Sequence, residues 1–593
     1  MLDAVVRSFL RDCPVKDAMN LLRAVSAFDR FQASDGINAA AELVADAARK
    51  AALDSVTVTC YEANGLRQWW SFEAPLAWSP KQARLALGLH RAHPRVLDHS
   101  QSPFALATYS CATPASGRRS SLVRFDPVSS DGAMKDAILV MGFDQAVRHD
   151  DVARFREAGV AGWLAHAGPN PAARGRIELP PASGMFAFSL TSEELEEALS
   201  CAHRHEMAEV RIEIDSTAPM PVVSACIEGH GDDEIWMMAH LCHPRPGAND
   251  NASGVAAVWA CAALLAAARH KGRLGERHPS MRFFWMPEFC GTASVLADLE
   301  ARKGSRRPRA VVNLDMVGED QEQCGCPFIV ERSPVQLGWG LSALAEQVVA
   351  SVFDLTSETR GSWRTSGYLG FSDHSLFADG SVNVPAIQMT HWPDRFNHSS
   401  DDSVDKISAA EMRRAITAAA ATVCLTSYFL QDPGMFSDDG LCAWRDTERK
   451  ALHAVAGRYR EMAAGAWSEG FLQSTLPDLL DTRPFGTSMQ IRYPKCVPGG
   501  LQRSWNGPFN ARSMIAALSP ARRKELLTRI RANKLNLAIL NTLALLLDGT
   551  RDGQAMQQAV SHAFRRPPDR LSIEPLLGDF IESGWAVVIN GPT

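Results

Sequence analysis

The sequence predicts an α/β fold, because short apolar runs alternate along the chain with longer segments of helical pattern. A long apolar helix is expected directly after Gly254, and many of the apolar runs end in polar turns. Several of these runs end in an acid or a histidine, and open α/β sheets place their ligands at strand ends. The strands that carry this prediction are 235–239, 281–286, 310–314 and 384–389.

Length and composition are those of a multidomain soluble protein. The chain has 593 residues, which favours three to four domains, with 46% hydrophobic and 22% charged residues. The net charge of −6 gives no reason to expect nucleic-acid binding by the whole chain or adhesion to anionic membranes. No run of apolar residues is long enough to span a bilayer, and the N-terminus lacks the apolar core of a signal peptide. The 13 cysteines are scattered, as in reduced cytoplasmic proteins.

The segment from His240 to Gly254 is the strongest single motif. It reads HLCHPRPGANDNASG, follows an apolar run and precedes the apolar helix. His240 at a strand end and Asp250 ten residues later are ligand types suited to zinc. The alternative interpretation is a polar loop between strand and helix.

Further acids and histidines stand near the ends of the later strands. Glu288 follows 281–286, and Asp315 follows 310–314. His398 comes after 384–389, and the pair Asp373-His374 precedes that strand. Each motif alone is weak, because an acid at a strand end often only caps the next helix. Together, in this order, they indicate a metal site.

This order resembles that of the co-catalytic zinc aminopeptidases, the M28-type metallopeptidases, and more narrowly a branch with the signature HLCHPxPGANDNASG. The resemblance implies that His240 and Asp315 hold one zinc ion and that Glu288 and His398 hold the other. It implies that Asp250 bridges the two ions. Such a shared carboxylate offsets the repulsion between two cations that clamp water and a carbonyl oxygen. The resemblance further implies that Asp373 and His374 lie beside the site.

At the general base, the chain departs from the wider family. That family has Glu-Glu at the second strand end, whereas the neighbours of Glu288 are Pro287 and Phe289. Glu288 is therefore either a ligand, with the base supplied by a residue such as Glu319 or Glu331, or the base, with one zinc ion short of a ligand. The number of zinc ions, one or two, stays open at this point.

The second departure is Cys242, which stands where the wider family has an aspartate that orients the first histidine. Either the Cys242 thiol or His243 must then orient the imidazole of His240. Cys242 is interpreted as a buried neutral thiol, with zinc ligation as the alternative. For His243, a loop imidazole bonded to the backbone and a substrate or metal role are both retained.

Four segments are predicted. Residues 1–74 form the first part of the catalytic domain, with Ser34 capping a helix before an edge strand at 56–61. Residues 75–180 resemble a β-rich protease-associated insert. Residues 181–431 form the second part of the catalytic domain, whose sheet is expected to resume at 208–215. Residues 432–593 resemble a mostly helical winged-helix domain. The predicted fold is thus a zinc-aminopeptidase-like mixed sheet flanked by helices, with these two additions.

These observations predict a zinc-dependent hydrolase, foremost an aminopeptidase that acts on peptides or amides with a free N-terminus. Glu288 is the predicted proton-transfer group. The main alternative is an amidohydrolase, deacylase or cyclase acting on a small metabolite or biosynthetic peptide. A second alternative is a non-enzymatic relative that binds peptides.

A DNA-binding role is the remaining alternative, and it depends on a basic cluster in the C-terminal segment. We interpret this cluster as a solvated helix face instead, because Glu525 interrupts it. The cluster consists of Arg522, Arg523, Lys524, Arg529, Arg531 and Lys534.

The sequence does not specify the substrate, and a homo-oligomer is compatible with it. Five loop residues near the site motifs are candidates for a substrate pocket or for packing between domains: Trp363, Arg364, Tyr368, Trp392 and Arg395. Cys324-Gly-Cys326 has the wrong spacing for a CxxC site and is interpreted as a loop.

Overall fold

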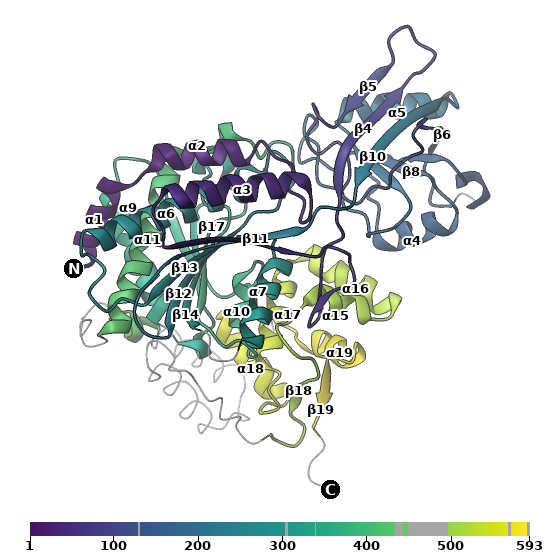
Figure 1. Ribbon diagram of the computed structural model, residues 1–593. Helices are drawn as coiled ribbons and strands as arrows, with labels where there is room; N and C mark the ends of the chain where they lie inside the picture. Colours follow the sequence, from purple (N-terminus) through teal and green to yellow (C-terminus); the bar gives the residue numbers. More distant parts are fainter. Residues whose placement is uncertain are drawn as a thin grey trace.

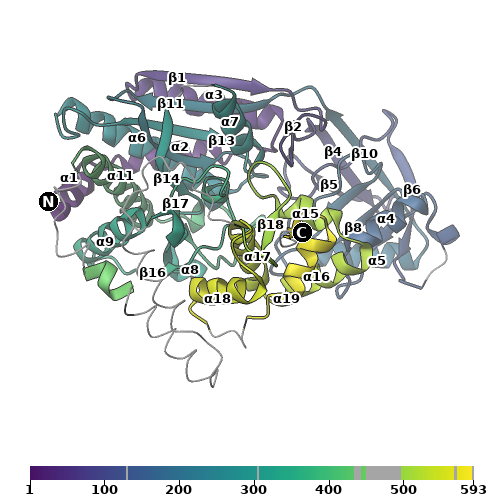
Figure 2. The ribbon, with the colours of Figure 1, turned by 90° about the horizontal axis from the view of Figure 1, so that it is seen from below.

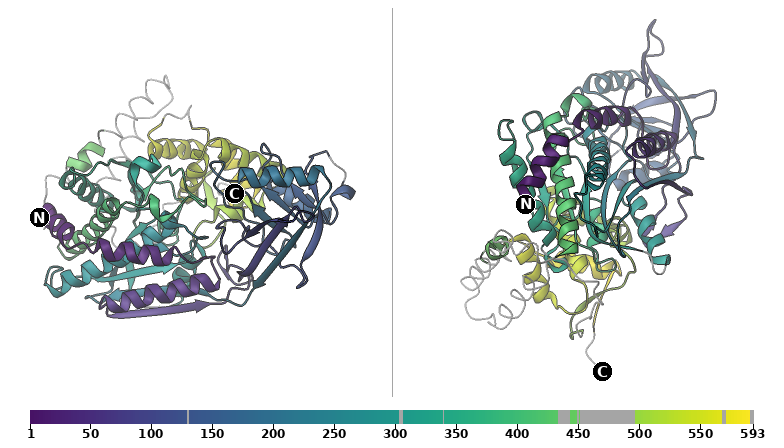
Figure 3. Two further views of the ribbon diagram at one scale, coloured as in Figure 1. Left: turned by 90° about the horizontal axis from the view of Figure 1, so that it is seen from above. Right: turned by 60° about the vertical axis from the view of Figure 1, so that its left-hand side comes forward.

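The computed structural model describes residues 1–128, 131–302, 306–338, 340–432, 443–448, 450, 496–566 and 571–589. Figure 1 shows a large sheet with helices on its faces, a second sheet at one end of the molecule and a C-terminal group of helices. The views in Figures 2 and 3 agree that the C-terminal helices lie beside both sheets.

The large sheet has eight strands in the order β1-β11-β13-β12-β14-β17-β15-β16. Its centre is parallel, since β12 pairs in parallel with β13 and β14, and β14 with β17. β1 lies at one edge, as the sequence predicts. The strands are β1 (Ser55–Tyr61), β11 (Met220–Ile227), β12 (Asp233–His240), β13 (Ser280–Met286), β14 (Arg307–Leu314), β15 (Phe328–Glu331), β16 (Trp363–Ser366) and β17 (Ala386–His391).

Both faces of this sheet are covered, which explains why its central strands are nearly continuous apolar runs. In β12, Ile235 and Met237 face one core, whereas Trp236 and Met238 face the other. Six helices contribute to the first core: α1 (Leu2–Asp12), α2 (Val15–Val25), α3 (Asp35–Lys50), α6 (Gly254–His270), α9 (Gly340–Leu355) and α11 (Ala409–Gln431). The other core contains α7 (Cys290–Ala301), α10 (His374–Ala378) and the short strands β2 (Gln68–Trp69) and β3 (Phe72–Glu73).

The helix starts follow the local sequence. The Ser34 side chain accepts a hydrogen bond from the backbone N–H of Ile37, which confirms the predicted cap of α3. α6 is apolar on every side and is buried, as expected of a helix packed between a sheet and other helices.

A second sheet of seven strands has the order β5-β4-β10-β6-β7-β8-β9. α5 packs on one of its faces and α4 on the other. The elements are β4 (Ser79–Leu87), β5 (Arg95–Asp98), β6 (Arg118–Arg124), β7 (Ile138–Val140), α4 (His149–Glu157), β8 (Gly162–Ala165), β9 (Phe186–Ser189), α5 (Ser192–His203) and β10 (Met207–Asp215).

The prediction that the catalytic sheet resumes at 208–215 is wrong. β10 pairs with β4 and β6 in the second sheet, so this sheet extends to Asp215. Alternating burial along β10 fits any strand with one buried face, and only the pairing partners decide which sheet it joins. The resemblance of this region to a protease-associated domain stays a prediction.

The C-terminal elements have their own apolar core and contact the catalytic part. Asn541 donates to the carbonyls of Leu369 and Gly370, and Arg503 pairs with Asp379. The elements are β18 (Leu501–Arg503), α15 (Ala511–Ala517), α16 (Pro520–Ala532), α17 (Leu535–Leu546), α18 (Gly553–Phe564), α19 (Glu574–Glu582) and β19 (Ala586–Val588). The resemblance to a winged helix stays a prediction.

The basic cluster of this region is partly neutralised from within. Arg522 and Arg529 both pair with the buried Asp579, at 2.7 and 2.9 Å. Arg523 donates to the carbonyls of Ala516 and Leu518. These contacts favour a packing role for the cluster.

One helical segment among the described residues, Ala248–His270, is long and apolar enough to cross a membrane. Its most apolar window is 83% buried inside the protein, as in a core helix.

Candidate metal centre

The carboxyl ends of the parallel strands bring the predicted residues together at one edge of the large sheet. His240 is the last residue of β12, Asp315 directly follows β14, and Glu288 lies two residues after β13. His398 lies in the loop after β17. Asp250 lies in a wide turn, Ala248–Ser253, that leads into α6. Parallel pairing of neighbouring strands produces this convergence.

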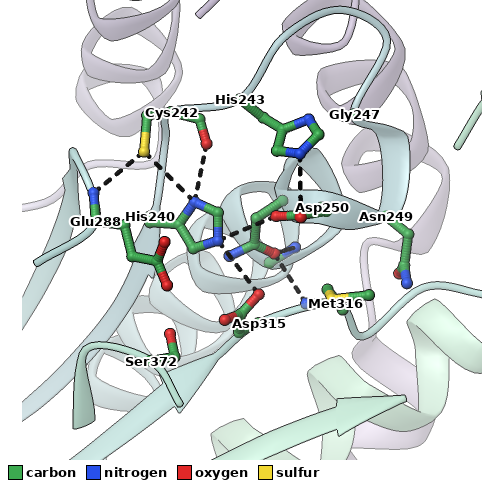
Figure 4. A network of polar contacts seen from close by, with 12 residues as sticks. His240, Cys242, His243, Gly247, Asn249, Asp250, Glu288, Asp315, Met316 and Ser372 are labelled. Carbon is green, nitrogen blue, oxygen red and sulfur yellow. Dashed lines mark hydrogen bonds and ion pairs between the residues drawn. The ribbon is translucent and has the colours of Figure 1, made fainter. Parts of the chain in front are cut away.

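His240, Glu288 and Asp315 form one group, in which the donor atoms lie within 4.8 Å of one another. His240 Nε2 is 3.3 Å from Asp315 Oδ1 and 3.2 Å from Asp250 Oδ1. Figure 4 shows the imidazole of His240 between these carboxylates.

His243, Asp250 and His398 form a second group, whose donor atoms also lie within 4.8 Å of one another. Asp250 Oδ2 is 3.1 Å from His243 Nε2 and 3.3 Å from His398 Nε2. One oxygen of Asp250 therefore faces each group, which is the arrangement of a bridging carboxylate.

These groups differ from the expected pairing in two ways. Glu288 lies with His240 and Asp315 rather than with His398. The ligand atom beside His398 comes from His243, which the sequence left open between a loop role and a metal role. The loop after β12 brings His243 Nε2 to 3.1 Å from Asp250 Oδ2, whereas Glu288 lies in the turn that follows the neighbouring strand β13.

The side chains present fit divalent cations. The Nδ1 atoms of His240 and His243 donate to the carbonyls of Cys242 and Pro244. Their Nε2 atoms, which are then free to act as ligands, face carboxylate oxygens. His243 Nε2 and Asp315 Oδ1 are buried and make no hydrogen bond. Among the described residues, no Lys or Arg forms an ion pair with any of the three carboxylates. A cation between these atoms would satisfy them, and imidazole with carboxylate is a zinc-binding set.

Electrostatics at the centre follow from burial and from the crowding of carboxylates. Burial raises the pKa of Glu288 to about 8; nearby His240 opposes this, and Asp373 and Asp315 add to it. Burial lowers the pKa of His243 to about 4, against the attraction of Asp250. His243 is therefore neutral at pH 7, as a metal ligand must be.

Cys242 acts through its backbone as well as its thiol. Its carbonyl accepts from His240 Nδ1 at 3.0 Å, which is the orienting contact that the wider family assigns to an aspartate. Its Sγ accepts from the Glu288 backbone N–H at 3.2 Å. A buried thiol that links the two strand ends fits these contacts, and Cys242 is in neither ligand group.

Asp402 and Arg30 hold the turn that carries Asp250, and sequence reasoning missed both. Asp402 is fully buried and accepts from the backbone N–H groups of Asn249 and Asp250, at 2.6 and 3.0 Å. Its place four residues after His398 was the only available signal.

The guanidinium of Arg30 is fully buried and donates to backbone carbonyls only. It bonds the carbonyls of Leu241 and Gly247 at 2.9 Å each, as well as those of Val25, Phe28 and Pro246. The backbones of Arg30 and His243 also exchange two hydrogen bonds. A lone arginine far from any motif carries no sequence signal of this role.

Three residues at the centre have left-handed backbone conformations without being glycine. They are Phe289, Met316 and His398, with φ of 59°, 61° and 56°. The first two directly follow Glu288 and Asp315. Such strain persists only where surrounding contacts impose it, and it clusters at functional sites.

The other predicted residues support the site from a distance. Asp373 accepts from the Phe289 backbone N–H and from Thr292 Oγ1, at 2.7 Å each, and so holds the turn after Glu288. His374 bonds Glu331 at 2.7 Å, which leaves Glu331 engaged and outside both groups. Glu319 lies in a separate group with two cysteines, also outside the centre.

A cavity of about 420 Å³ opens beside His398. The residues that line it come from the second-sheet region, the loop after β17 and the C-terminal region: Ala167, Pro169, Arg176, Glu178, Asn397, His398 and Arg512. Arg176 pairs with Glu178 at 2.7 Å, which leaves Arg512 as the uncompensated charge of this lining. None of the five loop residues proposed from the sequence lines it; for example, Tyr368 packs on His374 and Arg395 donates to Cys324.

Comparison with known proteins gave matches at the level of family and fold. Residues 222–423 match the model of peptidase family M28. The zinc aminopeptidase BSAP from Bacillus subtilis is 16% identical with a TM-score of 0.50, over 70% of this chain and 95% of that one. A putative peptidase from Clostridium acetobutylicum is 12% identical with a TM-score of 0.51, over 98% of both chains. A peptidase M28 precursor from Shewanella amazonensis SB2B is 14% identical with a TM-score of 0.50, over 72% and 96%. No curated protein sequence matched.

Proposed function

We propose that the protein is a zinc-dependent aminopeptidase, from the match of residues 222–423 to the model of peptidase family M28 and from the geometry of the two ligand groups. The observation that carries the proposal is the bridging position of Asp250, with one oxygen toward His240 and the other toward His243 and His398.

The ligand count supports two zinc ions. His240, Asp315 and one oxygen of Asp250 would hold the first. His243, His398 and the other oxygen of Asp250 would hold the second. Each position then has three protein donors, the usual number at a catalytic zinc ion. Glu288 is not needed as a ligand, because His243 takes the place of the carboxylate that this chain lacks.

Glu288 is therefore the proposed general base. When bound, the two ions lower the pKa of a water molecule and polarise the scissile carbonyl. The Glu288 carboxylate accepts no hydrogen bond from the described residues and is half-buried, so it can face a substrate. The charge of bound cations would lower the Glu288 pKa from about 8, so that the carboxylate could take the proton of the attacking water and pass it to the leaving amine.

The cavity beside His398 is the proposed place for the remainder of the peptide. Arg512 contributes a positive charge to its wall, and the paired Arg176 and Glu178 are together neutral. A short peptide would place its terminal carboxylate near Arg512. We also propose a reducing, cytoplasmic location, which the twelve free cysteines of the described residues support.

The decisive assay compares aminoacyl amides and short peptides that have a free N-terminus with the same compounds N-acetylated. The metal-free protein is measured first, and zinc is then added back. We expect zinc-dependent release of the first residue from the free compounds only.

Equal or greater turnover of the N-acetylated compounds would contradict an aminopeptidase and favour a deacylase. Release of ammonia from the side-chain amide of an N-terminal glutamine, with closure of that residue to a pyroglutamyl ring, would favour a cyclase. Absence of bound zinc after repletion would contradict both the metal centre and the enzymatic role.

A further inference from the structure

A second cluster of metal-ligand types lies outside the proposed catalytic centre. Glu319, Cys324 and Cys326 are all buried, and one donor atom of each lies within 4.8 Å of the others. Cys326 Sγ is 3.6 Å from Glu319 Oε2. The sequence spacing had indicated only a loop here.

Backbone geometry explains how two cysteines one residue apart face the same point. Gly325 ends the short helix α8 (Gln321–Cys324) with a φ of 69°, which is a conformation that glycine adopts without strain. The chain thus turns sharply between the two thiols and directs both toward Glu319. A CxxC spacing is not required when such a turn intervenes.

The acidic side chains of this cluster have no basic partner among the described residues. Glu319 is fully buried, and its Oε1 atom has no hydrogen-bond partner. The carboxyl of the half-buried Asp394 interacts with Glu319, so a second acid stands beside the buried one. The nearby Arg395 donates to the carbonyl of Cys324, and no Lys or Arg pairs with Glu319 among the described residues. Burial, with Asp394 adding to it, raises the pKa of Glu319 to about 10.

We propose that Glu319, Cys324 and Cys326, with Asp394 beside them, form a third metal site that takes zinc or a cation of similar softness. Thiolates are the common ligands of structural zinc sites, and a carboxylate oxygen is a further ligand type that zinc accepts. A divalent cation would pair with the unpartnered oxygen of Glu319 and remove the repulsion between the two acids. Binding would release the thiol protons to solvent.

Such an ion would connect two loops that meet at the catalytic centre. Asp394 belongs to the loop that carries His398, and its Oδ2 accepts from Asn249, the neighbour of the bridging Asp250. Asn249 Oδ1 in turn accepts from the backbone N–H of Gly318, next to Glu319. The third ion would thus hold the His398 loop without contacting substrate.

Cobalt substitution separates this site from the catalytic one, because only the third site offers thiolate ligands. Metal-free full-length protein is reconstituted with Co²⁺, and the near-ultraviolet band of thiolate-to-cobalt charge transfer is recorded. Zinc per chain is counted in parallel. We expect a thiolate band in the parent and three zinc ions per chain. In Cys324→Ser/Cys326→Ser, the band should vanish and two ions should remain.

Cys242→Ser is the matched control, since this thiol lies beside the catalytic centre and should leave the band unchanged. Glu319→Gln provides a second variant should the double serine variant fail to fold, and we expect it to weaken the third ion selectively. Two ions and no thiolate band in the folded parent would overturn the proposal.

A band that depends on Cys242 and not on Cys324 or Cys326 would also overturn it. So would a disulfide between Cys324 and Cys326, seen as 11 instead of 13 reactive thiols in unfolded, metal-free protein. None of these readouts requires peptidase activity. The experiment can therefore refute the third metal site while the proposed aminopeptidase function stands, and an activity assay can refute that function while the third site stands.

Discussion

Replacing Glu288 by glutamine should abolish most turnover while leaving both catalytic ions in place. The backbone around Glu288 is held by contacts that the substitution does not touch: Cys242 Sγ accepts from its N–H, and Gln32 donates to its carbonyl. Asp373 holds the following turn through Phe289. Glutamine has nearly the same shape as glutamate, so folding should be unaffected.

The expected loss follows from the role of Glu288 in proton transfer. General acid–base catalysis by a positioned side chain contributes about 10²- to 10⁴-fold. At about 1.36 kcal/mol for each factor of ten, this corresponds to about 2.7 to 5.4 kcal/mol in the barrier. The loss should appear in kcat rather than in KM, because the three donors of each metal position remain.

The assay is steady-state hydrolysis of a free aminoacyl amide by zinc-loaded protein, with zinc counted in the same sample. Glu42→Gln is the matched control, since Glu42 is an exposed acid on α3, outside both ligand groups and the cavity lining, and should change kcat little. Near-parental kcat in Glu288→Gln would refute the assignment. Loss of one zinc ion together with activity would instead make Glu288 a ligand.

Four further predictions test the surrounding structure. His243→Ala should lower the zinc count from two catalytic ions to one, measured by elemental analysis; an unchanged count would contradict its role as a ligand. Arg30→Met should destabilise the protein by about 2 to 6 kcal/mol in urea unfolding, because at least two buried carbonyls lose their donor at about 1 to 3 kcal/mol each; Arg30→Lys should cost less. Asp402→Asn should weaken zinc binding about 10- to 100-fold in competition with a chelator, because the Asp250 turn loses part of its support; unchanged affinity would make Asp402 dispensable. Arg512→Ala should raise KM for a dipeptide but not for the dipeptide amide, which lacks the carboxylate; equal effects on both would exclude the proposed contact.

Local patterns identified most of the elements and most of the residues in the two candidate ligand groups. The apolar runs that became β12, β13 and β14 are buried on both faces, and such strands are visible as continuous runs. His240, Asp250, Glu288 and Asp315 were found from their places at or after these strands, and His398 from its place after β17. They do meet at one edge of the sheet.

Pairing between the ligands could not be predicted in the same way. The family resemblance placed Glu288 with His398, whereas in the structure His243 lies beside His398 and Glu288 lies beside His240 and Asp315. A local pattern does not encode which of these side chains meet. The wrong assignment of β10 has a similar origin, since an alternating strand does not encode its partner.

The sequence by itself determined the fold class, the family resemblance and the chemical types gathered at the centre, because strand periodicity and ligand chemistry are local properties. Tertiary structure alone decided that Asp250 faces both ligand groups and that His243 completes the second one. It also decided that Arg30 holds the loop between β12 and α6, and that Cys324 and Cys326 meet Glu319. Each of these depends on distances between residues far apart in the chain, or on a single backbone turn, which only the packed structure defines.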